Sequence, residues 1–375
     1  MKKILLLIFI LFIIGCIFLS IRIFIFNDDQ DQYTHQKNTT KKNISKQKEQ
    51  STQKTVNNID DYLNSTHFNG NITVYKNGQR IMSKAYGYRN FELSISNDKQ
   101  SMYLLGSANK FVTGMILKQL EEEGKVHLDE NVNHYIPNFN TQQQYPITVR
   151  DLVLHNSGLA KYKVNSYSHG LDSAIDDIKL HGIIPSNYHV YNYNDANYII
   201  IAKIIENVTH QSFQKNLEKY IIHKLNLKHT SLFNSSEHQP FFVKGYEQRD
   251  NHLIFTPTKS LDKFFGAGNI YTSTDDMAKI VLNFKNGQLL NQISTQNLLA
   301  PAEFGLYPSY YRYGFYNYPK HQRYRGIFFN TDFITYSNDQ YIVSIASNQL
   351  IRPYNEQLES STKHIFTKIL NQKLS

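Results

Sequence analysis

Cysteine and tryptophan are nearly absent from this chain of 375 residues, which has one Cys and no Trp. A single cysteine excludes an intramolecular disulfide framework and any metal site built from several cysteines. The 15 histidines also lack the His-Glu-x-x-His spacing of a zinc hydrolase. The sequence therefore predicts neither a metal site nor a cofactor.

Charged residues are also few, at 19% of the chain against 41% apolar residues. A chain of this length and composition can bury at least one large core and is not mainly disordered. Its net charge of +9 suits an anionic partner. Composition alone leaves that partner open as nucleic acid, membrane headgroups or a phosphate-rich polymer.

The excess of positive charge is spread along the chain. Residues 1–60 hold 9 Lys/Arg and 5 Asp/Glu, a net charge of +4, and the remainder carries +5. That remainder shows no cluster of Lys and Arg interleaved with aromatics and glycines, no zinc-finger spacing and no helix-turn-helix signature. We therefore expect no nucleic-acid partner.

The chain begins with a long apolar run. Two lysines precede an apolar stretch over 4–19, and apolar residues continue to Phe26. Since roughly 20 residues cross a bilayer, residues 1–26 are predicted to be a membrane anchor whose leading lysines stay inside. The alternative is a lipoprotein signal that ends at Cys16, because Ile-Ile-Gly-Cys at 13–16 fits its cleavage box. Both interpretations tether an exported body to the cell membrane.

Two further regions follow the anchor. Residues 27–58 are rich in Gln, Asn, Lys, Thr and Ser without helical or strand periodicity, which predicts a disordered polar tether. Residues 59–375 read as one globular domain without internal repeats. The strands expected in it are 72–75, 81–86, 328–336 and 340–347, and the helices are 108–123, 196–208, 213–225 and 356–370. This order predicts one sheet built from N- and C-terminal segments beside a helical middle region.

A Ser-x-x-Lys motif, Ser107 to Lys110, opens the helix expected at 108–123. A serine at a helix N-terminus lies in the positive end of the helix dipole, and a lysine three residues on can reach its oxygen. The pattern occurs seven times in the chain, but only here does it follow an apolar stretch and a glycine and precede a core helix. The alternative is a helix N-cap beside a surface lysine.

Three other segments carry polar groups that suit catalysis. The first is Tyr193-Asn194-Asp195, which lies before the helix expected at 196–208. A tyrosine can act as a general base when a lysine lies nearby. In an extended chain, the carboxylate two residues later points to the same side as the tyrosine. The other two segments are 154–159, Leu-His-Asn-Ser-Gly-Leu, and 266–271, Gly-Ala-Gly-Asn-Ile-Tyr. Taken singly, Asp195 can be a helix cap and the other two segments can be turns.

In this order and spacing, the four segments resemble the serine β-lactamase and penicillin-binding-protein superfamily, specifically its class C β-lactamase-related branch, over roughly 60–370. Ser107-x-x-Lys110 resembles the nucleophile motif, Tyr193-Asn194-Asp195 takes the place of Tyr-x-Asn, and 155–159 resembles His-Thr-Ser-Gly-Leu. The resemblance implies an α/β (α+β) fold with a central antiparallel sheet flanked by helices and a helical middle subdomain. It also makes 59–375 a catalytic domain.

Two departures from the superfamily pattern bear on the substrate. The third motif, Lys-Thr-Gly or His-x-Gly, is represented by Tyr324-Arg325-Gly326-Ile327, which keeps only the glycine. Asp195 stands where the superfamily usually has Asn, and a carboxylate repels an anionic substrate and attracts an ammonium. Together these features resemble the branch of Gram-positive cell-surface esterases that remove D-alanine from teichoic acids.

This resemblance implies a mechanism and a partner. Lys110 and Tyr193 would take the proton of Ser107, Asp195 would hold the D-alanyl ammonium, and teichoic acid would be the anionic partner. The backbone N–H groups of Ser107 and of Ile327, next to Gly326, would bind the oxyanion. Water would then hydrolyse the acyl-serine, and the catalytic domain would be extracellular.

Other functions stay open on the sequence. The same fold serves a low-affinity penicillin-binding protein, a D,D-carboxypeptidase or a β-lactamase-like hydrolase. A non-catalytic wall-binding scaffold is a third possibility. The sequence predicts neither an oligomeric state nor a preference between wall and lipoteichoic acid.

Overall fold

The computed structural model describes the chain apart from residues 140, 141, 143, 166, 168, 251, 302–309, 352–356 and 375. Within the first helix, the side chains of 25–46 are also outside the description. The chain divides into two compact units, Met1–Asn58 and Ile59–Ser375.

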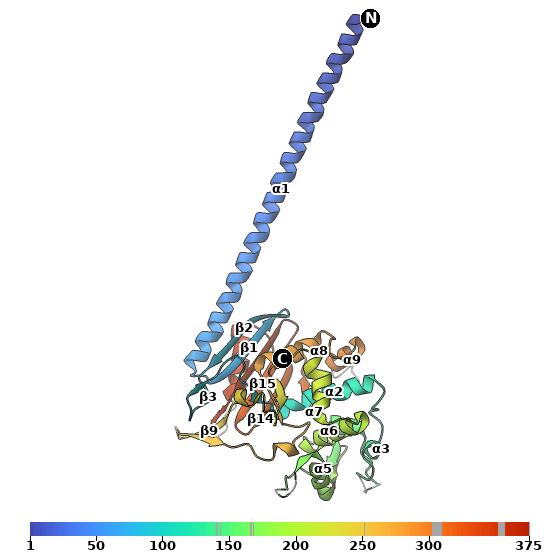
Figure 1. Ribbon diagram of the computed structural model, residues 1–375, viewed down its shortest axis with the longest axis vertical. Coiled ribbons are helices and arrows are strands. Elements are labelled where there is room, and N and C mark those ends of the chain that lie inside the picture. The colour runs from blue at the N-terminus through green and yellow to red at the C-terminus, as the bar shows by residue number, and fades with distance from the viewer. Residues whose placement is uncertain are drawn as a thin grey trace. The chain divides into compact units, whose positions relative to one another are not determined.

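The first unit is helical. Helix α1, Lys2–Ser65, begins in it (Figure 1). Its segment Lys2–Phe24 has 23 residues with a mean hydropathy of 3.3 and exposed side chains, so it is long and apolar enough to cross a membrane. This helix fits a single-pass anchor or a signal sequence. Cys16 is a free, exposed thiol within it.

The expectation of an unstructured tether over 27–58 differs from the structure, in which α1 runs through this segment. The physical reason is the lack of any helix-breaking residue: no glycine or proline occurs between 27 and 58. Lys and Gln, which favour helices, are frequent there. A helix without an apolar face therefore continues where the absence of periodicity suggested irregular chain.

The large sheet of the second unit has seven strands in the order β12-β13-β14-β15-β16-β1-β2, and all neighbours are antiparallel. Strand β1 lies between β2 and β16, so strands from the two ends of the domain pair side by side within one sheet; Figure 1 shows β1, β2, β14 and β15 in this sheet. This confirms the predicted sheet of N- and C-terminal segments. The strands are Gly70–Lys76 (β1), Gln79–Tyr86 (β2), Tyr311–Arg312 (β12), Phe315–Asn317 (β13), Gln322–Phe328 (β14), Thr331–Ser337 (β15) and Tyr341–Ser347 (β16).

The β1–β2 hairpin turns at Asn77-Gly78. Both residues have positive φ angles, 50° and 78°. A two-residue turn of this kind requires left-handed backbone at both positions, which Asn and Gly adopt at little cost. The turn therefore sets the register that pairs Lys76 with Gln79.

Helices cover both faces of the large sheet. Because strand neighbours alternate, Tyr324 of β14 packs on Phe111 of one helix, whereas Arg323 and Arg325 reach Glu359 of another on the opposite face. The helices nearest the sheet are α2 (Asn109–Glu122), α8 (Thr274–Lys285), α9 (Gln292–Leu299) and α10 (Gln357–His364), which continues into the π-helix η5 (Ile365–Ile369).

The middle region is helical, as expected. It contains α3 (Val132–Tyr135), α4 (Val149–Val153), α5 (Gly170–His181), α6 (Asp195–Thr209), α7 (Phe213–Leu217) and the π-helix η2 (Glu218–His223). Two small sheets pair segments of this region with strands outside it: β5 (Tyr103–Leu104) with β11 (Ile270–Thr272) and β8 (Thr230–Leu232), and β9 (Gly245–Arg249) with β10 (His252–Thr256) and β17 (Gln349–Ile351). The remaining small sheets are local: β6 (Ser157–Leu159) with β7 (Ile183–Tyr188), and β3 (Tyr88–Asn90) with β4 (Ile95–Ser96).

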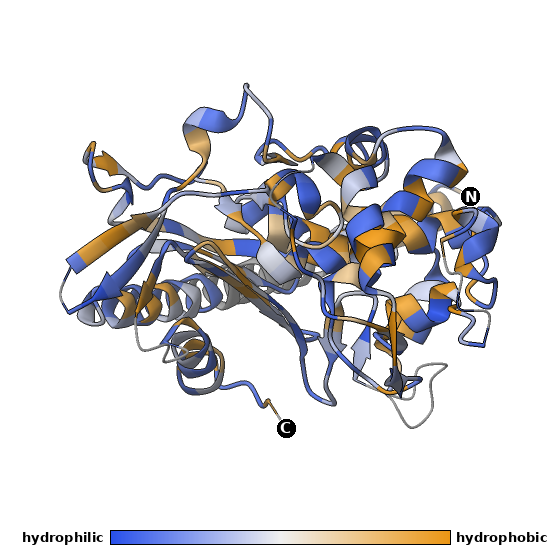
Figure 2. Cartoon of the chain, turned by 90° about the horizontal axis from the view of Figure 1, so that it is seen from below, coloured by the Kyte–Doolittle hydropathy of each residue, from blue (hydrophilic) through white to orange (hydrophobic). Residues whose placement is uncertain are grey.

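One continuous core joins the sheet to the middle region. Apolar residues, orange in Figure 2, gather along the strands and in the helices beside them. Helices α2 and α6 lie at its centre, since most residues of both are buried. Burial on this scale fixes the first turns of these two helices, where the predicted site residues lie.

A charged cluster holds β14 against α10. Glu359 accepts hydrogen bonds from Arg323, at 2.8 Å, from Arg325 and from the Tyr336 hydroxyl, and Arg325 also pairs with buried Asp332. Burial alone would raise the pKa of Glu359, but Arg323 and its other partners outweigh it and lower the pKa to about 2.

The folded pKa of Glu359 lies below its ordinary value of 4.5, so its contribution to stability is present above about pH 4.5 and is lost as the pH falls toward 2. A shift of this size corresponds to on the order of 3 kcal/mol. We expect Glu359→Gln to lower the free energy of unfolding at pH 7. At pH 3 the difference in this free energy between the variant and wild type should be smaller. Urea unfolding followed by circular dichroism measures this. Exposed Glu237→Gln is the control, and an equal loss at both pH values would contradict the prediction.

Candidate active site

Ser107 and Lys110 lie where the chain enters helix α2. Ser107 is in the middle of the 3-10 turn η1, Gly106–Ala108, and Lys110 is the second residue of α2. Lys110 Nζ lies 3.2 Å from Ser107 Oγ. One helical turn thus brings the two side chains together, which confirms the contact expected from their spacing.

Lys110 is fully buried and well supplied with acceptors. Its Nζ donates to Asp195 Oδ1 at 2.6 Å, to Ser107 Oγ and to the carbonyl of Ala267 at 3.3 Å, and it lies 4.9 Å from the centre of the Tyr193 ring. Burial alone would lower the pKa of Lys110, but the Asp195 carboxylate and the Tyr193 phenol outweigh it and raise the pKa. Lys110 is therefore an ammonium at neutral pH.

Tyr193 and Asp195 reach Lys110 because Asn194 between them anchors the loop before α6. Its side-chain oxygen accepts from the N–H of Ala196, which caps the helix, and its amide donates to the carbonyl of Leu159 at 3.0 Å. Tyr193 remains 37% exposed, and so does the side chain of Asp195. The site therefore opens to solvent through these two residues, while Lys110 forms its floor.

His155, in the predicted segment 154–159, contacts the loop before α6 from the buried side. Its Nδ1 accepts from the N–H of Asn194 at 3.2 Å and from Asn197 Nδ2 at 2.8 Å, so its Nε2 carries the proton donated to Tyr311 Oη at 2.9 Å. Burial, followed by the charge of Lys110, lowers the pKa of His155 well below its usual value. A neutral imidazole thus lies against the Tyr193 ring, with ring centres 4.4 Å apart.

The fourth predicted segment packs on α2. Thr113 Oγ1 donates to the carbonyl of Gly266 at 2.8 Å, and the N–H of Ile270 donates to Asn109 Oδ1 at 3.0 Å. Because these bonds fix the backbone on both sides of Ala267, its carbonyl is held against Lys110. The segment is therefore part of the site and not only a turn.

Strand β14 brings Gly326 and Ile327 against η1. A Cβ on Gly326 would lie 2.0 Å from the carbonyl oxygen of Leu105 and 2.4 Å from the N of Ser107, so no side chain fits there. A Cβ on Gly106 would lie 3.1 Å from the N of Ile327. The backbone amides of Ser107 and Ile327 thus occupy neighbouring positions on two touching segments.

The structure therefore brings together all six residues that the sequence singled out. No role was expected from the sequence for His155, Tyr311 or the carbonyl of Ala267. A signal for Tyr311 was present, because five tyrosines occur between 310 and 318. Which of them would reach the site depended on how β12 and β13 fold back on the sheet.

Comparison with known proteins agrees with this geometry. The family model described as Beta-lactamase matches residues 56–360. The chain belongs to the beta-lactamase family. The teichoic acid D-alanine hydrolase of Staphylococcus aureus is 40% identical over 348 residues, which cover 92% of this chain and 85% of that protein. With Ser107 beside Lys110, membership of this family makes the chain a serine hydrolase.

Solved structures show the same beta-lactamase-type fold. The crystal structure of FmtA from Staphylococcus aureus, 40% identical, superposes with a TM-score of 0.81 over 85% of this chain and 89% of that one. The D-amino acid amidase from Ochrobactrum anthropi, 18% identical, has a TM-score of 0.70 over 86% of this chain and 98% of that one. At that identity, the amidase supports the fold alone.

This member of the beta-lactamase family lacks a free cation on the strand beside the nucleophile. Tyr324 occupies the position of the motif lysine but is fully buried, with its ring 4.5 Å from that of Phe111. Arg325, the next residue, is bound to Asp332 and Glu359 on the other face of the sheet. Neither side chain is placed to bind a carboxylate at Ser107.

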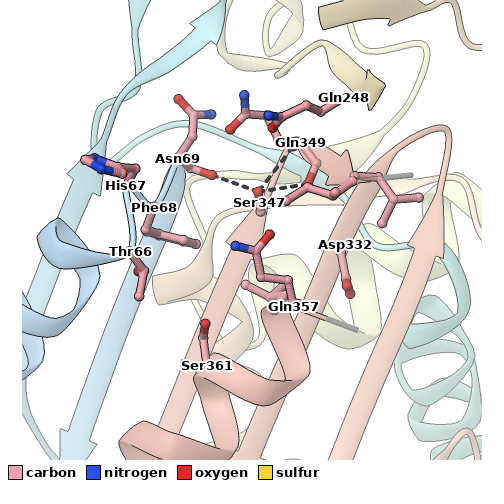
Figure 3. Close-up of a pocket in the computed structure, with 13 residues that line it drawn as sticks. Thr66, His67, Phe68, Asn69, Gln248, Asp332, Ser347, Gln349, Gln357 and Ser361 are labelled. Atoms are coloured by element: carbon pink, nitrogen blue, oxygen red, sulfur yellow. Dashed lines mark hydrogen bonds between the residues drawn. The ribbon is translucent and has the colours of Figure 1, made fainter. Parts of the chain in front are cut away.

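A polar cavity of about 260 Å³ lies elsewhere in the domain, beside α10 (Figure 3). Ser347 in its wall donates to the carbonyl of Asn69 at 2.8 Å, and buried Asp332 is also part of its lining. Its lining includes none of the residues around Ser107 and Lys110. The chemistry expected of a beta-lactamase-family enzyme is therefore assigned to the site on β14 and α2.

Proposed function

We propose that this chain is an extracytoplasmic serine esterase that removes D-alanine from teichoic acids. The observation that carries the proposal is the Asp195 carboxylate, which lies at the open edge of the site within reach of Lys110 and Ser107. A D-alanyl ester presents an ammonium next to the carbonyl that is attacked, and a carboxylate at this place attracts it. The 40% identical hydrolase named for the same substrate adds independent support.

In the proposed mechanism, Ser107 Oγ attacks the ester carbonyl. Lys110 rests as an ammonium paired with the Asp195 oxygen 2.6 Å away; when the substrate ammonium reaches that carboxylate the pair weakens, Lys110 loses its proton to solvent, and the resulting amine accepts the proton of Ser107. This changes the expected role of Asp195, which acts on Lys110 as well as on substrate. The proton on Lys110 then passes, with the help of Tyr193, to the alcohol oxygen that leaves.

The oxyanion that forms is held by backbone amides. The N–H groups of Ser107 and Ile327 would donate to it from two rigid segments whose contact depends on Gly326. Water then attacks the D-alanyl ester of Ser107, and the same groups return the proton. Free D-alanine and the enzyme are released.

The lack of a free cation on β14 beside Ser107 favours this esterase over a penicillin-binding protein or D,D-carboxypeptidase. Substrates of those enzymes carry a carboxylate beside the scissile bond, and here Asp195 would repel it, while Arg325 is already paired with Asp332. Helix α1 would hold the enzyme at the outer face of the membrane, where teichoic acids are made and displayed.

The full-length protein in detergent, incubated with purified D-alanylated teichoic acid, tests this function. We expect free D-alanine to appear, and an acid-quenched sample to contain the peptide of Ser107 enlarged by one D-alanyl group in mass spectrometry. The Ser107→Ala protein is the blank. If the wild type and the Ser107→Ala protein release D-alanine at the same rate, the proposal is wrong.

Recognition of the ammonium by Asp195 predicts selective damage in Asp195→Ala. Loss of the contact with Lys110 slows every ester, but only the D-alanyl ester also loses its own charge partner. We expect the ratio of kcat/KM for D-alanyl over acetyl glycerol to fall about tenfold, the equivalent of one partly exposed charge pair. Asp262→Ala, which removes another partly buried carboxylate, serves as a control. An unchanged ratio in Asp195→Ala would contradict ammonium recognition.

A further inference from the structure

A groove of about 740 Å³ lies at the edge of the large sheet, between β13, the β15–β16 turn and the C-terminal residues 371–373. Its lining is mainly polar and carries two tyrosines, Tyr310 and Tyr318. Six side-chain amides also line it: Asn317, Gln322, Asn338, Gln340, Asn371 and Gln372. Amides and tyrosines together offer the donors, acceptors and flat rings that hydroxyl-rich ligands require.

The charge in this groove is positive. Lys285, Lys320 and Lys373 line it and face one carboxylate, Asp339. Lys285 is engaged, since it donates to Gln322 at 2.9 Å. Lys320 and Lys373 are exposed and form no ion pair within the part of the chain that the structure describes. Two lysine ammoniums are therefore available to an anionic ligand such as a phosphate diester.

A row of touching tyrosine rings joins the groove to the candidate active site. The Tyr193 ring, over Lys110, lies 6.0 Å from that of Tyr311, which lies 5.1 Å from Tyr316. Tyr316 is nearly parallel to Tyr318 at 5.7 Å, and Tyr318 is 5.4 Å from Tyr310. The residues Tyr193 and Tyr310 are 37% and 46% exposed, so both ends of the row reach solvent.

We propose that this groove binds the sugar-bearing polyol-phosphate chain of the polymer whose D-alanyl ester is cleaved at Ser107. Sugar rings lie on Tyr310 and Tyr318, hydroxyls bond to the amides, and backbone phosphates pair with Lys320 and Lys373. The row of tyrosines, whose middle member Tyr311 is buried, fixes the position of the groove relative to the nucleophile. This inference rests on the proposed function and adds to it a binding site for the polymer, distinct from the one that holds the D-alanyl group.

Binding is tested on polymer that carries no ester. Full-length Ser107→Ala protein in detergent is titrated with teichoic acid from which D-alanine has been removed by mild alkali. We expect Kd to rise about tenfold in Tyr318→Ala and in Tyr310→Ala, and about threefold in Lys320→Gln, with the lysine effect vanishing in 1 M salt. Tyr88→Ala and Lys99→Gln, which change exposed residues outside the groove lining, should bind as the parent does.

Two comparisons decide the ligand class. Polymer stripped of its sugars should bind more weakly and should no longer respond to Tyr318→Ala, whereas Lys320→Gln should still matter. A single-stranded oligodeoxynucleotide with the same number of phosphates should bind at least tenfold more weakly than the glycosylated polymer. Equal binding of the oligonucleotide, or full affinity in both tyrosine variants, would overturn the proposal.

Kinetics separate this inference from the proposed function. In the active chain, Tyr318→Ala should raise KM for D-alanylated polymer and leave kcat/KM for D-alanyl glycerol unchanged. Failure of the wild type to release D-alanine from either substrate would refute the esterase, yet the titration with ester-free polymer would still report on the groove. If Tyr318→Ala loses activity on both the D-alanylated polymer and D-alanyl glycerol, the ring has a structural role, and the proposed polymer-binding groove is overturned.

Discussion

Replacing Ser107 with alanine is expected to reduce D-alanine release by at least about 10⁴-fold, close to the uncatalysed rate. Ser107 Oγ is the hydroxyl group that lies 3.2 Å from Lys110 Nζ, and the variant loses this nucleophile. The fold should survive, because Ser107 is half-exposed and its side chain caps no helix. Release of D-alanine from purified teichoic acid measures the loss, and circular dichroism checks the fold.

Lys110→Met should cause a loss of similar size, because Ser107 then has no base and Asp195 no partner. The two residues act as one unit, so the double variant should be no slower than either single variant. Losses that multiply in the double variant would show that Lys110 acts elsewhere than on Ser107. Met keeps the length of the side chain, but the unpaired Asp195 is partly exposed and can be solvated.

Gly326→Ala is expected to lower kcat by at least about 100-fold, the usual effect of disturbing one oxyanion donor. The new Cβ would lie 2.0 Å from the Leu105 carbonyl and 2.4 Å from the Ser107 amide, which are backbone atoms of a buried turn. Strand β14 and η1 must therefore separate, and the Ile327 amide moves with the strand. The enzyme is assayed well below its unfolding temperature, which we also expect to fall.

Gly268→Ala is the matched control for that experiment. Its Cβ would meet the ring of Phe328 at 3.3 Å, a side chain that can shift, and the Cα of Gly106 at 3.7 Å, an ordinary van der Waals contact. We expect its kcat to stay within about threefold of wild type. A normal kcat in Gly326→Ala would show that the contact between β14 and η1 does not position the oxyanion site.

The sequence predicted those parts of the site that depend on local spacing. Ser107 and Lys110 are one helical turn apart, and any helix that begins at this point brings them together. The Asn77-Gly78 turn likewise determines its hairpin by backbone conformation alone. The sheet of N- and C-terminal segments followed from the order of strands and helices, and the structure confirms it.

The remaining features depend on residues that are distant in sequence. The pairing of Asp195 with Lys110 brings together positions 85 residues apart, and the bond from His155 to Tyr311 spans 156. The sequence could therefore suggest a carboxylate for the substrate but not its bond to the lysine. The helix through 27–58 was missed for another reason, since an absence of apolar periodicity does not prevent a segment without glycine or proline from forming a helix.

The position of β1 in the sheet has a consequence for export. Its hairpin with β2 emerges early, but a two-stranded hairpin is only marginally stable alone, and its other neighbour, β16, lies at 341–347, near the end of the chain. The sheet cannot close until β16 has been made and, under the proposed export, translocated. A chain held at the membrane by its first helix would therefore cross in an unfolded state and complete its domain only outside.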